Sequence, residues 1–174
     1  MAVQTTCLVV FAGRPGCGKT TVARALADEM GTTFLRIDTI EAAIVATLMP
    51  FEENPVGYVA AAWVAEDQLR GGRSVVVDAC NNVEAARKMW TDLAGRLNVA
   101  LSWVEVICSD VAEHRRRVET RVPDWPGQGN PTWAQVQARQ WEPFTEPRIL
   151  IDNIDETGTV AAKVAAIRAE LPTN

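Results

Sequence analysis

Residues 13–20 read GRPGCGKT, between the apolar run CLVVFA at 7–12 and a stretch with helical spacing that begins at Lys19. This is the pattern GxxxxGK[ST] in the setting that validates it, after a strand and before a helix. Glycines let successive backbone N–H groups converge on an anion, the helix N-terminus adds its positive dipole end, and Lys19 adds a point charge. The stretch therefore predicts a phosphate-binding loop.

The alternative is a chance glycine-rich turn, which the fixed positions and the correct flanks weigh against. A helix N-terminus lowers the pKa of a nearby thiol, but we interpret Cys17 as a variable filler position rather than a reactive group. Thr20 offers a hydroxyl to Mg²⁺. The residues expected to bind a nucleotide here are Gly13, Arg14, Pro15, Gly16, Cys17, Gly18, Lys19, Thr20 and Thr21.

Apolar runs alternate with helical stretches along the chain, which is typical of an α/β domain with a mainly parallel sheet. At 174 residues the chain fits one domain, covering 1–174. The expected strands are 7–12, 33–37, 74–77, 101–108 and 148–151; the expected helices are 19–30, 56–70, 111–121 behind an Asp110 cap, and 157–171. The segment 122–131, with three prolines and two glycines, breaks this alternation and predicts a functional loop or lid.

Composition narrows the function classes. Hydrophobic residues are 48% and charged residues 22%, which excludes a disordered chain, a collagen and a coiled coil. The net charge of −5 argues against general nucleic-acid binding. No apolar run approaches the ~20 residues that span a bilayer, and the opening MAVQTTCLVVFAGRPG lacks the positive leader of a signal peptide, so a cytoplasmic protein without a membrane partner is expected. Four well-separated cysteines predict reduced thiols.

Two aspartates follow predicted strands. Asp78 ends SVVVD and Asp38 follows TFLRI. The carboxyl ends of parallel strands face the ligand crevice, so both carboxylates should lie near the phosphates. Asp78 is then a candidate to hold Mg²⁺, directly or through water. The alternative for Asp78 is a helix cap or an ordinary loop residue.

These stretches resemble the P-loop small-molecule kinases, the group of gluconate kinase, adenylylsulfate kinase, chloramphenicol phosphotransferase, zeta-type toxins and polynucleotide kinases. The chain is most similar to the bacterial predicted kinases of this group, often labelled AAA-family ATPase. The stretches that carry the likeness are GRPGCGKTT, LRIDTIE, SVVVDACN, EHRRRVETR, PTWAQVQARQWEPF and ILIDN. The resemblance implies a three-layer α/β P-loop NTPase fold, with a five-stranded parallel sheet of order 2-3-1-4-5 and helices on both faces. It also implies substrate-side helices over 39–72, a small lid at about 122–140, and transfer of the ATP γ-phosphoryl group, with Mg²⁺, to a hydroxyl of a small metabolite, nucleoside or antibiotic.

The resemblance also implies roles for single residues. Asp38 corresponds to the aspartate that takes the proton of the acceptor hydroxyl or orients it. Glu41 stands where such kinases often have an arginine, and it should repel an anionic acceptor such as adenylylsulfate. Arg117 and Arg121 resemble lid arginines that stack on the base and reach the phosphates, with Arg139 a weaker candidate. Among their neighbours, His114, Arg115 and Arg116 are expected on a solvated helix face.

The acceptor should lie beside Asp38 and the segment 51–63, where Phe51 and Tyr58 make the wall partly apolar. Asn81, just past Asp78, is a further candidate contact, although an asparagine is equally expected in an ordinary loop. The tryptophans are expected to pack: Trp63, Trp90 and Trp103 in the core, and Trp125, Trp133 and Trp141 around the lid.

Two other functions stay open. A polynucleotide 5′-hydroxyl kinase would share the loop, the aspartate and the lid, but the acidic balance weighs against it. A nucleotide-binding switch protein would bind ATP without using an acceptor. The GTPase motif NKxD is absent from the sequence. The acceptor, the choice of ATP over GTP and the oligomeric state do not follow from the sequence.

Overall fold

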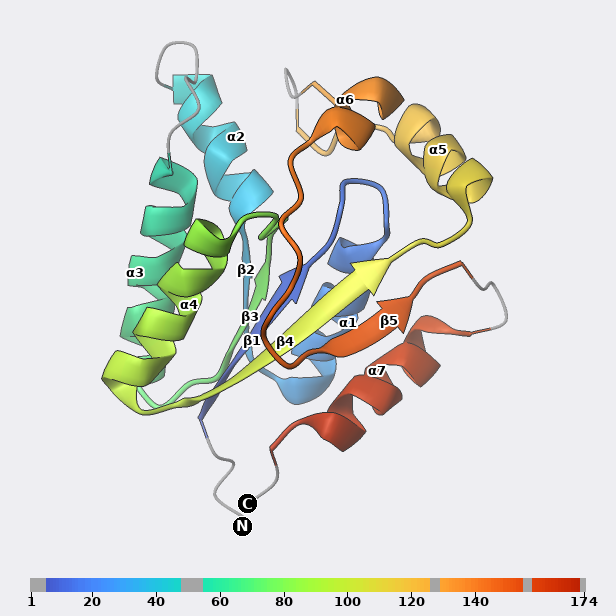
Figure 1. Ribbon diagram of the computed structural model, residues 1–174. Coiled ribbons are helices and arrows are strands. Elements are labelled where there is room, and N and C mark those ends of the chain that lie inside the picture. The colour runs from blue at the N-terminus through green and yellow to red at the C-terminus, as the bar shows by residue number, and fades with distance from the viewer. Residues whose placement is uncertain (1–5, 48–54, 126–128, 155–157, 173–174) are drawn as a thin grey trace.

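The computed structural model describes residues 6–47, 55–125, 129–154 and 158–172. In it one parallel sheet has the strand order β2-β3-β1-β4-β5, so the predicted order 2-3-1-4-5 is confirmed (Figure 1). The strands are β1 (Cys7–Ala12), β2 (Thr33–Arg36), β3 (Val75–Asp78), β4 (Ala100–Ile107) and β5 (Ile149–Asp152). β1 therefore lies at the centre of the sheet, between β3 and β4.

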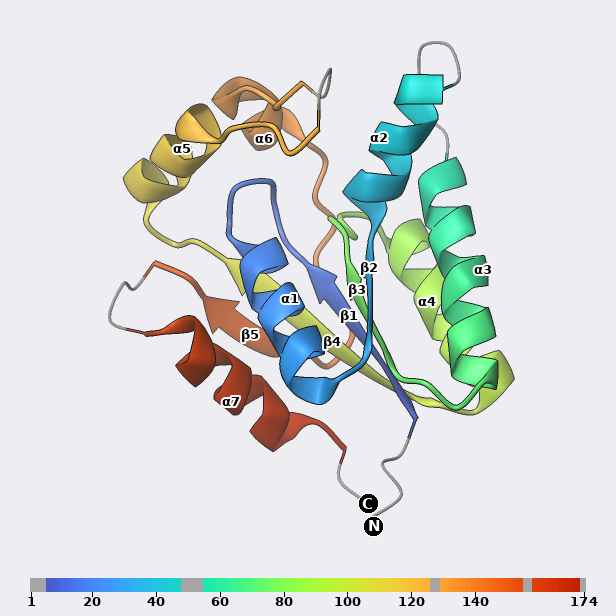
Figure 2. The same ribbon diagram turned by 180° about the vertical axis from the view of Figure 1, so that it is seen from behind.

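Helices cover both faces of this sheet and its carboxyl edge. They are α1 (Lys19–Met30), α2 (Ile37–Thr47), α3 (Val56–Arg70), α4 (Glu84–Leu97), α5 (Val111–Thr120), α6 (Trp133–Ala138) and α7 (Val160–Glu170). α1 and α7 cover one face, and α3 and α4 cover the other (Figures 1 and 2). α2, α5 and α6 stand at the edge where β1 ends. This is the three-layer arrangement that the sequence predicted.

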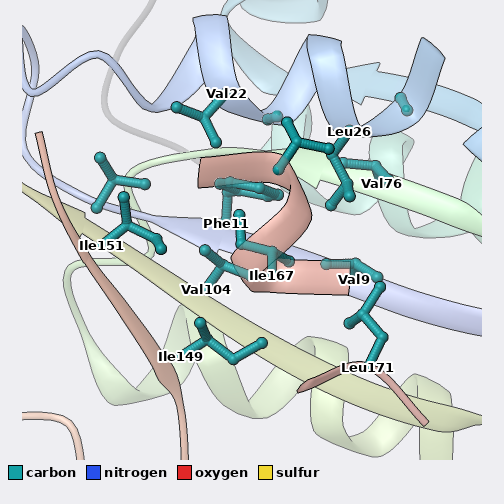
Figure 3. Packing of buried hydrophobic residues seen from close by; sticks show 14 of the residues in the cluster. Val9, Phe11, Val22, Leu26, Val76, Val104, Ile149, Ile151, Ile167 and Leu171 are labelled. Carbon is teal, nitrogen blue, oxygen red and sulfur yellow. The ribbon is translucent and has the colours of Figure 1, made fainter. Parts of the chain in front are cut away.

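Alternation along β1 divides the core in two. Val9 and Phe11 point toward α1 and α7, where they pack with Leu26 and Ile167 (Figure 3). Leu8 and Val10 point to the opposite face, where α3 and α4 cover them. All six residues of β1 are buried, as expected for the central strand of a parallel sheet. Each buried aliphatic side chain stabilises the fold by roughly 1.5–3 kcal/mol relative to exposure.

Two tryptophans and the histidine differ in burial from what the sequence predicted. Trp63 is 70% exposed on α3, so the core prediction is wrong for it, because Ala61, Ala62 and Ala65 form the inward face of that helix. Trp125 is also exposed. Trp90 and Trp103 are buried as predicted. His114 was expected in solvent, but it is buried against the glycine-rich loop.

Among the described residues, no helix combines the length and the hydropathy needed to cross a membrane.

Candidate active site

The glycine-rich loop follows β1 at the point where the chain order of the sheet reverses. Gly16 and Gly18 have φ values of 82° and 88°, which L side chains rarely adopt. A Cβ on Gly16 would lie 2.5 Å from Val118 Cγ2, and one on Gly18 would lie 2.1 Å from Asn153 Nδ2. The loop is therefore built for glycine at both positions. It leads into α1, whose N-terminal N–H groups face the same edge of the sheet.

Lys19 lies at the floor of this site. Its side chain is buried, and Nζ is 3.9 Å from Asp78 Oδ1 at the end of β3. Burial disfavours the charged amine, but the negative groups around it, Asp78 and Asp38 among them, outweigh burial and raise the pKa of Lys19. The ammonium group therefore stays charged, as a phosphate ligand requires.

Asp78 has an environment that fits a metal ion. Both of its carboxylate oxygens are buried and lack a hydrogen-bond partner among the described residues. Lys19 Nζ and Arg36 Nε balance the charge from 3.9 and 3.7 Å, beyond hydrogen-bond distance, so both oxygens can still accept a further ligand. Thr20, in the first turn of α1, follows Lys19 directly. Carboxylate and hydroxyl oxygens are the ligands that Mg²⁺ prefers, so Thr20 and Asp78 fit a nucleotide-bound Mg²⁺.

A cavity of about 500 Å³ opens beside Lys19, between α2 and a second wall formed by Arg121, residues 129–131 and Arg139. Asp38 lies in the first turn of α2, directly after β2, and faces the cavity. Ile37, Val45 and Ala46 of α2 add apolar surface to its lining. The predicted residues that line this cavity are Pro15, Lys19, Asp38, Glu41, Tyr58, Arg121 and Arg139.

Glu41 and Tyr58 form the wall of the cavity on the side of α3. A Cβ on Gly57 would come within 2.6 Å of Glu41 Cγ, so the glycine lets Glu41 lie against that helix. Burial, with the nearby Asp38, raises the pKa of Glu41 to about 7, although Arg139 opposes this shift. The Tyr58 hydroxyl accepts a hydrogen bond from the Asn81 amide at 3.2 Å.

Asn81 is a correction to the sequence analysis. Its side chain is fully buried, donates to the Phe11 carbonyl at 2.7 Å and accepts from Trp90 Nε1 at 3.1 Å. With φ at 49° the residue turns inward rather than toward the cavity. Asn81 thus joins β1 to α4 and is not among the residues that line the cavity.

The two lid arginines lie in different places. Arg121, directly after α5, reaches the cavity, and its Nη2 is 4.0 Å from Asp38 Oδ2. Arg117 donates to the Asn153 carbonyl at 2.7 Å, and Asn153 Nδ2 donates to the Cys17 carbonyl at 2.9 Å. Arg117 therefore lies over the helix end of the loop, beside the segment that follows β5.

Three residues predicted to bind the nucleotide direct their side chains elsewhere or are buried. The Arg14 side chain points toward the lid, where Nη1 donates to the Val136 carbonyl at 2.7 Å. Burial raises the pKa of Cys17 to about 11, which supports the filler interpretation over a reactive thiol. Thr21 is exposed on α1.

Sequence reasoning missed Arg36 and Asp124. Arg36 Nη2 donates to Asp124 Oδ2 at 2.6 Å and lies 3.3 Å from Asp38 Oδ2. An arginine inside a predicted strand carries no motif, and Asp124 lies in the irregular segment after α5. The position of Arg36 two residues before Asp38 was the one available signal, because it places both at the same strand end.

A glycine-rich loop at the reversal point of the sheet, with a buried lysine and an aspartate beside it, defines a P-loop nucleotide-binding protein. The family model AAA_33, an AAA domain, matches residues 8–145. The chain belongs to this family. No curated protein matches the sequence.

Solved structures show the same fold. A protein of Chloroflexus aurantiacus, provisionally described as a kinase, superposes with a TM-score of 0.76 at 18% identity, covering 95% of this chain and 96% of that one. The adenylylsulfate (APS) kinase CysC of Mycobacterium tuberculosis, solved with AMPPNP and APS, gives 0.71 at 15%, covering 95% and 96%. Kti12 of Chaetomium thermophilum, solved with ADP-AlF3, gives 0.69 at 19%, covering 95% and 100%.

Proposed function

We propose that this protein is an ATP- and Mg²⁺-dependent phosphotransferase that acts on a hydroxyl of a small molecule. The observation that carries the proposal is one cavity of about 500 Å³ that contains both Lys19 and Asp38. A phosphate on the loop and a hydroxyl on Asp38 would therefore share one space. A cavity of that volume suits a metabolite rather than a protein.

Each part of the site has a role in such a transfer. The loop amides and Lys19 bind the β- and γ-phosphates, and Thr20 with Asp78 would hold Mg²⁺, which neutralises phosphate charge when bound. Asp38 accepts the proton of the acceptor hydroxyl or orients it. Arg121, at the mouth of the cavity, supplies positive charge where negative charge develops on the transferred group.

The comparisons support the class of reaction. Two of the similar structures are described as kinases, and one of them was solved with an ATP analogue and its small-molecule acceptor. At 18% and 15% identity they match this chain in fold, whereas the acceptor depends on the residues of the cavity.

A nucleotide-switch protein is the second candidate. Arg14 contacts α6 in the predicted lid, and the Pro15 carbonyl contacts His114 on α5 just before it, so a change in the loop could move these helices. The likeness to Kti12 agrees with this alternative. A polynucleotide kinase has less support, since the chain carries a net charge of −5.

The test compares wild type with Asp38→Asn in ADP release and in ATP binding. Acceptor panels should include nucleosides, sugars, amino-alcohol antibiotics and 5′-hydroxyl oligonucleotides. For a phosphotransferase, one panel stimulates ADP release, and the variant loses that stimulation by about 10²–10⁴-fold while keeping its ATP affinity. Asp92→Asn, an exposed aspartate paired with Lys88, is the matched control. Equal, unstimulated ATPase rates in wild type and Asp38→Asn would instead favour the switch protein.

A further inference from the structure

Two guanidinium groups converge on one carboxylate at the edge of the cavity. Arg36 Nη2 donates to Asp124 Oδ2 at 2.6 Å, and Arg121 Nη2 donates to the same oxygen at 2.9 Å. Arg36 comes from the end of β2, Arg121 follows α5, and Asp124 lies in the segment between α5 and α6 (Figure 2). Three separate parts of the chain therefore meet at a single acid group.

Arg36 is built into the fold, whereas Asp124 is a surface residue. The Arg36 side chain is 6% exposed, and its Nε forms an ion pair with the buried Asp78, 3.7 Å from Oδ2. The Asp124 side chain is 42% exposed and comes from a stretch without helix or strand. Hydrogen bonds from Arg36 and Arg121 hold the pKa of Asp124 below its usual value, so it is ionised at neutral pH. The guanidinium pair is thus preorganised, and its anion is the replaceable member.

The pair lies within reach of the group that handles the acceptor hydroxyl. Asp38 Oδ2 is 3.3 Å from Arg36 Nη2 and 4.0 Å from Arg121 Nη2. A small molecule with its hydroxyl on Asp38 could therefore place a second group, a few bonds away, between the two arginines. Planar guanidinium groups suit carboxylate and phosphate oxygens better than neutral groups.

We propose that Arg36 and Arg121 bind an acid group of the acceptor, a carboxylate or a phosphate, and that Asp124 occupies this site until the acceptor displaces it. This inference rests on the proposed phosphotransferase and narrows its substrate class to hydroxy acids or phosphorylated alcohols.

Glu41 was the one residue from which the sequence predicted repulsion of an anionic acceptor. Burial raises the pKa of that carboxyl to about 7, so part of its charge is absent at neutral pH. Arg121 and Arg139 line the same cavity as cations, apart from Lys19 on the phosphate side. With Asp124 displaced, Arg36, Arg121 and Arg139 would outnumber the carboxylate of Asp38 and the partly charged Glu41 at the acceptor end, and this surplus of positive charge attracts an acid.

The experiment measures binding first, with ADP and Mg²⁺ saturating the phosphate loop so that an added anion cannot bind there. Calorimetry compares matched probes: glycerol, glycerate and glycerol phosphate, then glucose, gluconate and glucose 6-phosphate. Acid members should bind and neutral members should not. Glycerate and gluconate report on a carboxylate, and the two phosphate esters report on a phosphate. Comparing their affinities shows which acid group the site prefers.

Two variants move binding in opposite directions. Asp124→Asn removes the internal competitor and should tighten binding of the acid probe about tenfold, whereas Arg36→Gln should weaken it at least about tenfold. Since a folding defect would not tighten binding, the gain in Asp124→Asn keeps the test decisive if Arg36→Gln is unstable. Glu119→Gln, whose carboxylate pairs with Arg115 on the surface of α5, is the control.

Transfer assays with the same probes separate this inference from the proposed function. Phosphorylation of a neutral acceptor, unchanged in both variants, would overturn the acid-group site and leave the phosphotransferase intact. Acid binding that responds to both variants, without transfer to any probe, would support the site and contradict the phosphotransferase. Equal binding of acid and neutral probes overturns the inference.

Discussion

At the scale of single residues, the cavity holds two carboxyl groups in unlike surroundings. Asp38 lies beside the guanidinium groups of Arg36 and Arg121. Glu41 lies against Gly57 of α3, and the cation that lowers its pKa is Arg139. The first therefore has two guanidinium groups within 4.0 Å of its carboxylate. The second is a group whose charge depends on pH within the physiological range.

This difference predicts a pH effect on stability. The pKa of Glu41 is about 7 in the folded chain, against 4.5 for a free glutamate side chain, so the folded state binds more protons between these limits. The stability that Glu41 contributes is present below pH 4.5 and is lost as pH rises through 7. Glu41→Gln should remove this loss, which is on the order of 1 kcal/mol after allowance for partial exposure.

Urea denaturation of wild type and Glu41→Gln at pH 5 and pH 8 checks the prediction, with Glu119→Gln as the exposed control. The wild type should lose more stability than the variant between the two pH values. Parallel pH profiles of the two proteins would show that Glu41 titrates like a free glutamate.

Residues at strand ends could be predicted from the sequence, because topology alone brings them together. Lys19, Asp38 and Asp78 meet for that reason. Asn81 could not be placed, since its inward turn depends on the Phe11 carbonyl and Trp90, which lie far away along the chain. Arg36 was hidden for the same reason: its partner Asp124 is 88 residues away.

At the scale of elements, the glycine-rich loop is hydrogen-bonded to α5 and α6. Arg14 donates to the Val136 carbonyl at the heart of α6, and its guanidinium lies 5.1 Å from the centre of the Trp141 ring. His114 on α5 contacts the Pro15 carbonyl at 2.8 Å, and its ring packs edge-on against Trp133. Arg14 and Pro15, the variable positions of the loop, therefore contact α6 and α5, whereas the glycines shape the loop for phosphate binding.

Arg14→Met should loosen α6 without unfolding the protein. Loss of the Val136 hydrogen bond lowers the free energy of local opening by about 1–2 kcal/mol. Hydrogen exchange measured by mass spectrometry should become roughly five- to thirtyfold faster in peptides from 132–141 and stay unchanged in α7. Arg115→Met, which breaks only a surface ion pair on α5, is the control. Unchanged exchange in α6 would show that Arg14 does not hold the lid.

Elements with clear end signals were predictable. α1 and α3 have the predicted bounds, and Asp110 caps α5 by accepting from the amides of Ala112 and Glu113. No helix was predicted over 84–97, where α4 lies. Its N-cap residue is Val83, whose side chain cannot accept a hydrogen bond, so the usual start signal is missing.

At the scale of the whole molecule, the sheet separates two cores that share β1. Ile167 of α7 is fully buried on one face, and Leu93 of α4 is buried on the other. Because the same strand carries both faces, neither core can dissolve without exposing the other. The chain should therefore unfold as a single unit.

Ile167→Ala and Leu93→Ala should each lower the free energy of unfolding by about 2–5 kcal/mol through the cavity they create. Denaturation followed by tryptophan fluorescence and by far-UV circular dichroism should show one coincident transition for each variant. Val111→Ala, at a 63% exposed position, should change stability little. Two separate transitions in either core variant would contradict a single cooperative domain.

The buried imidazole between the loop and the lid gives this protein a natural spectroscopic probe. His114 is the only histidine in the sequence. Every imidazole signal in an NMR spectrum therefore comes from the one ring that contacts both Pro15 and Trp133. The ring current of Trp133 acts on that signal, so a nucleotide or acceptor that shifts the lid would be visible in a single resolved resonance, without any label attached to the chain.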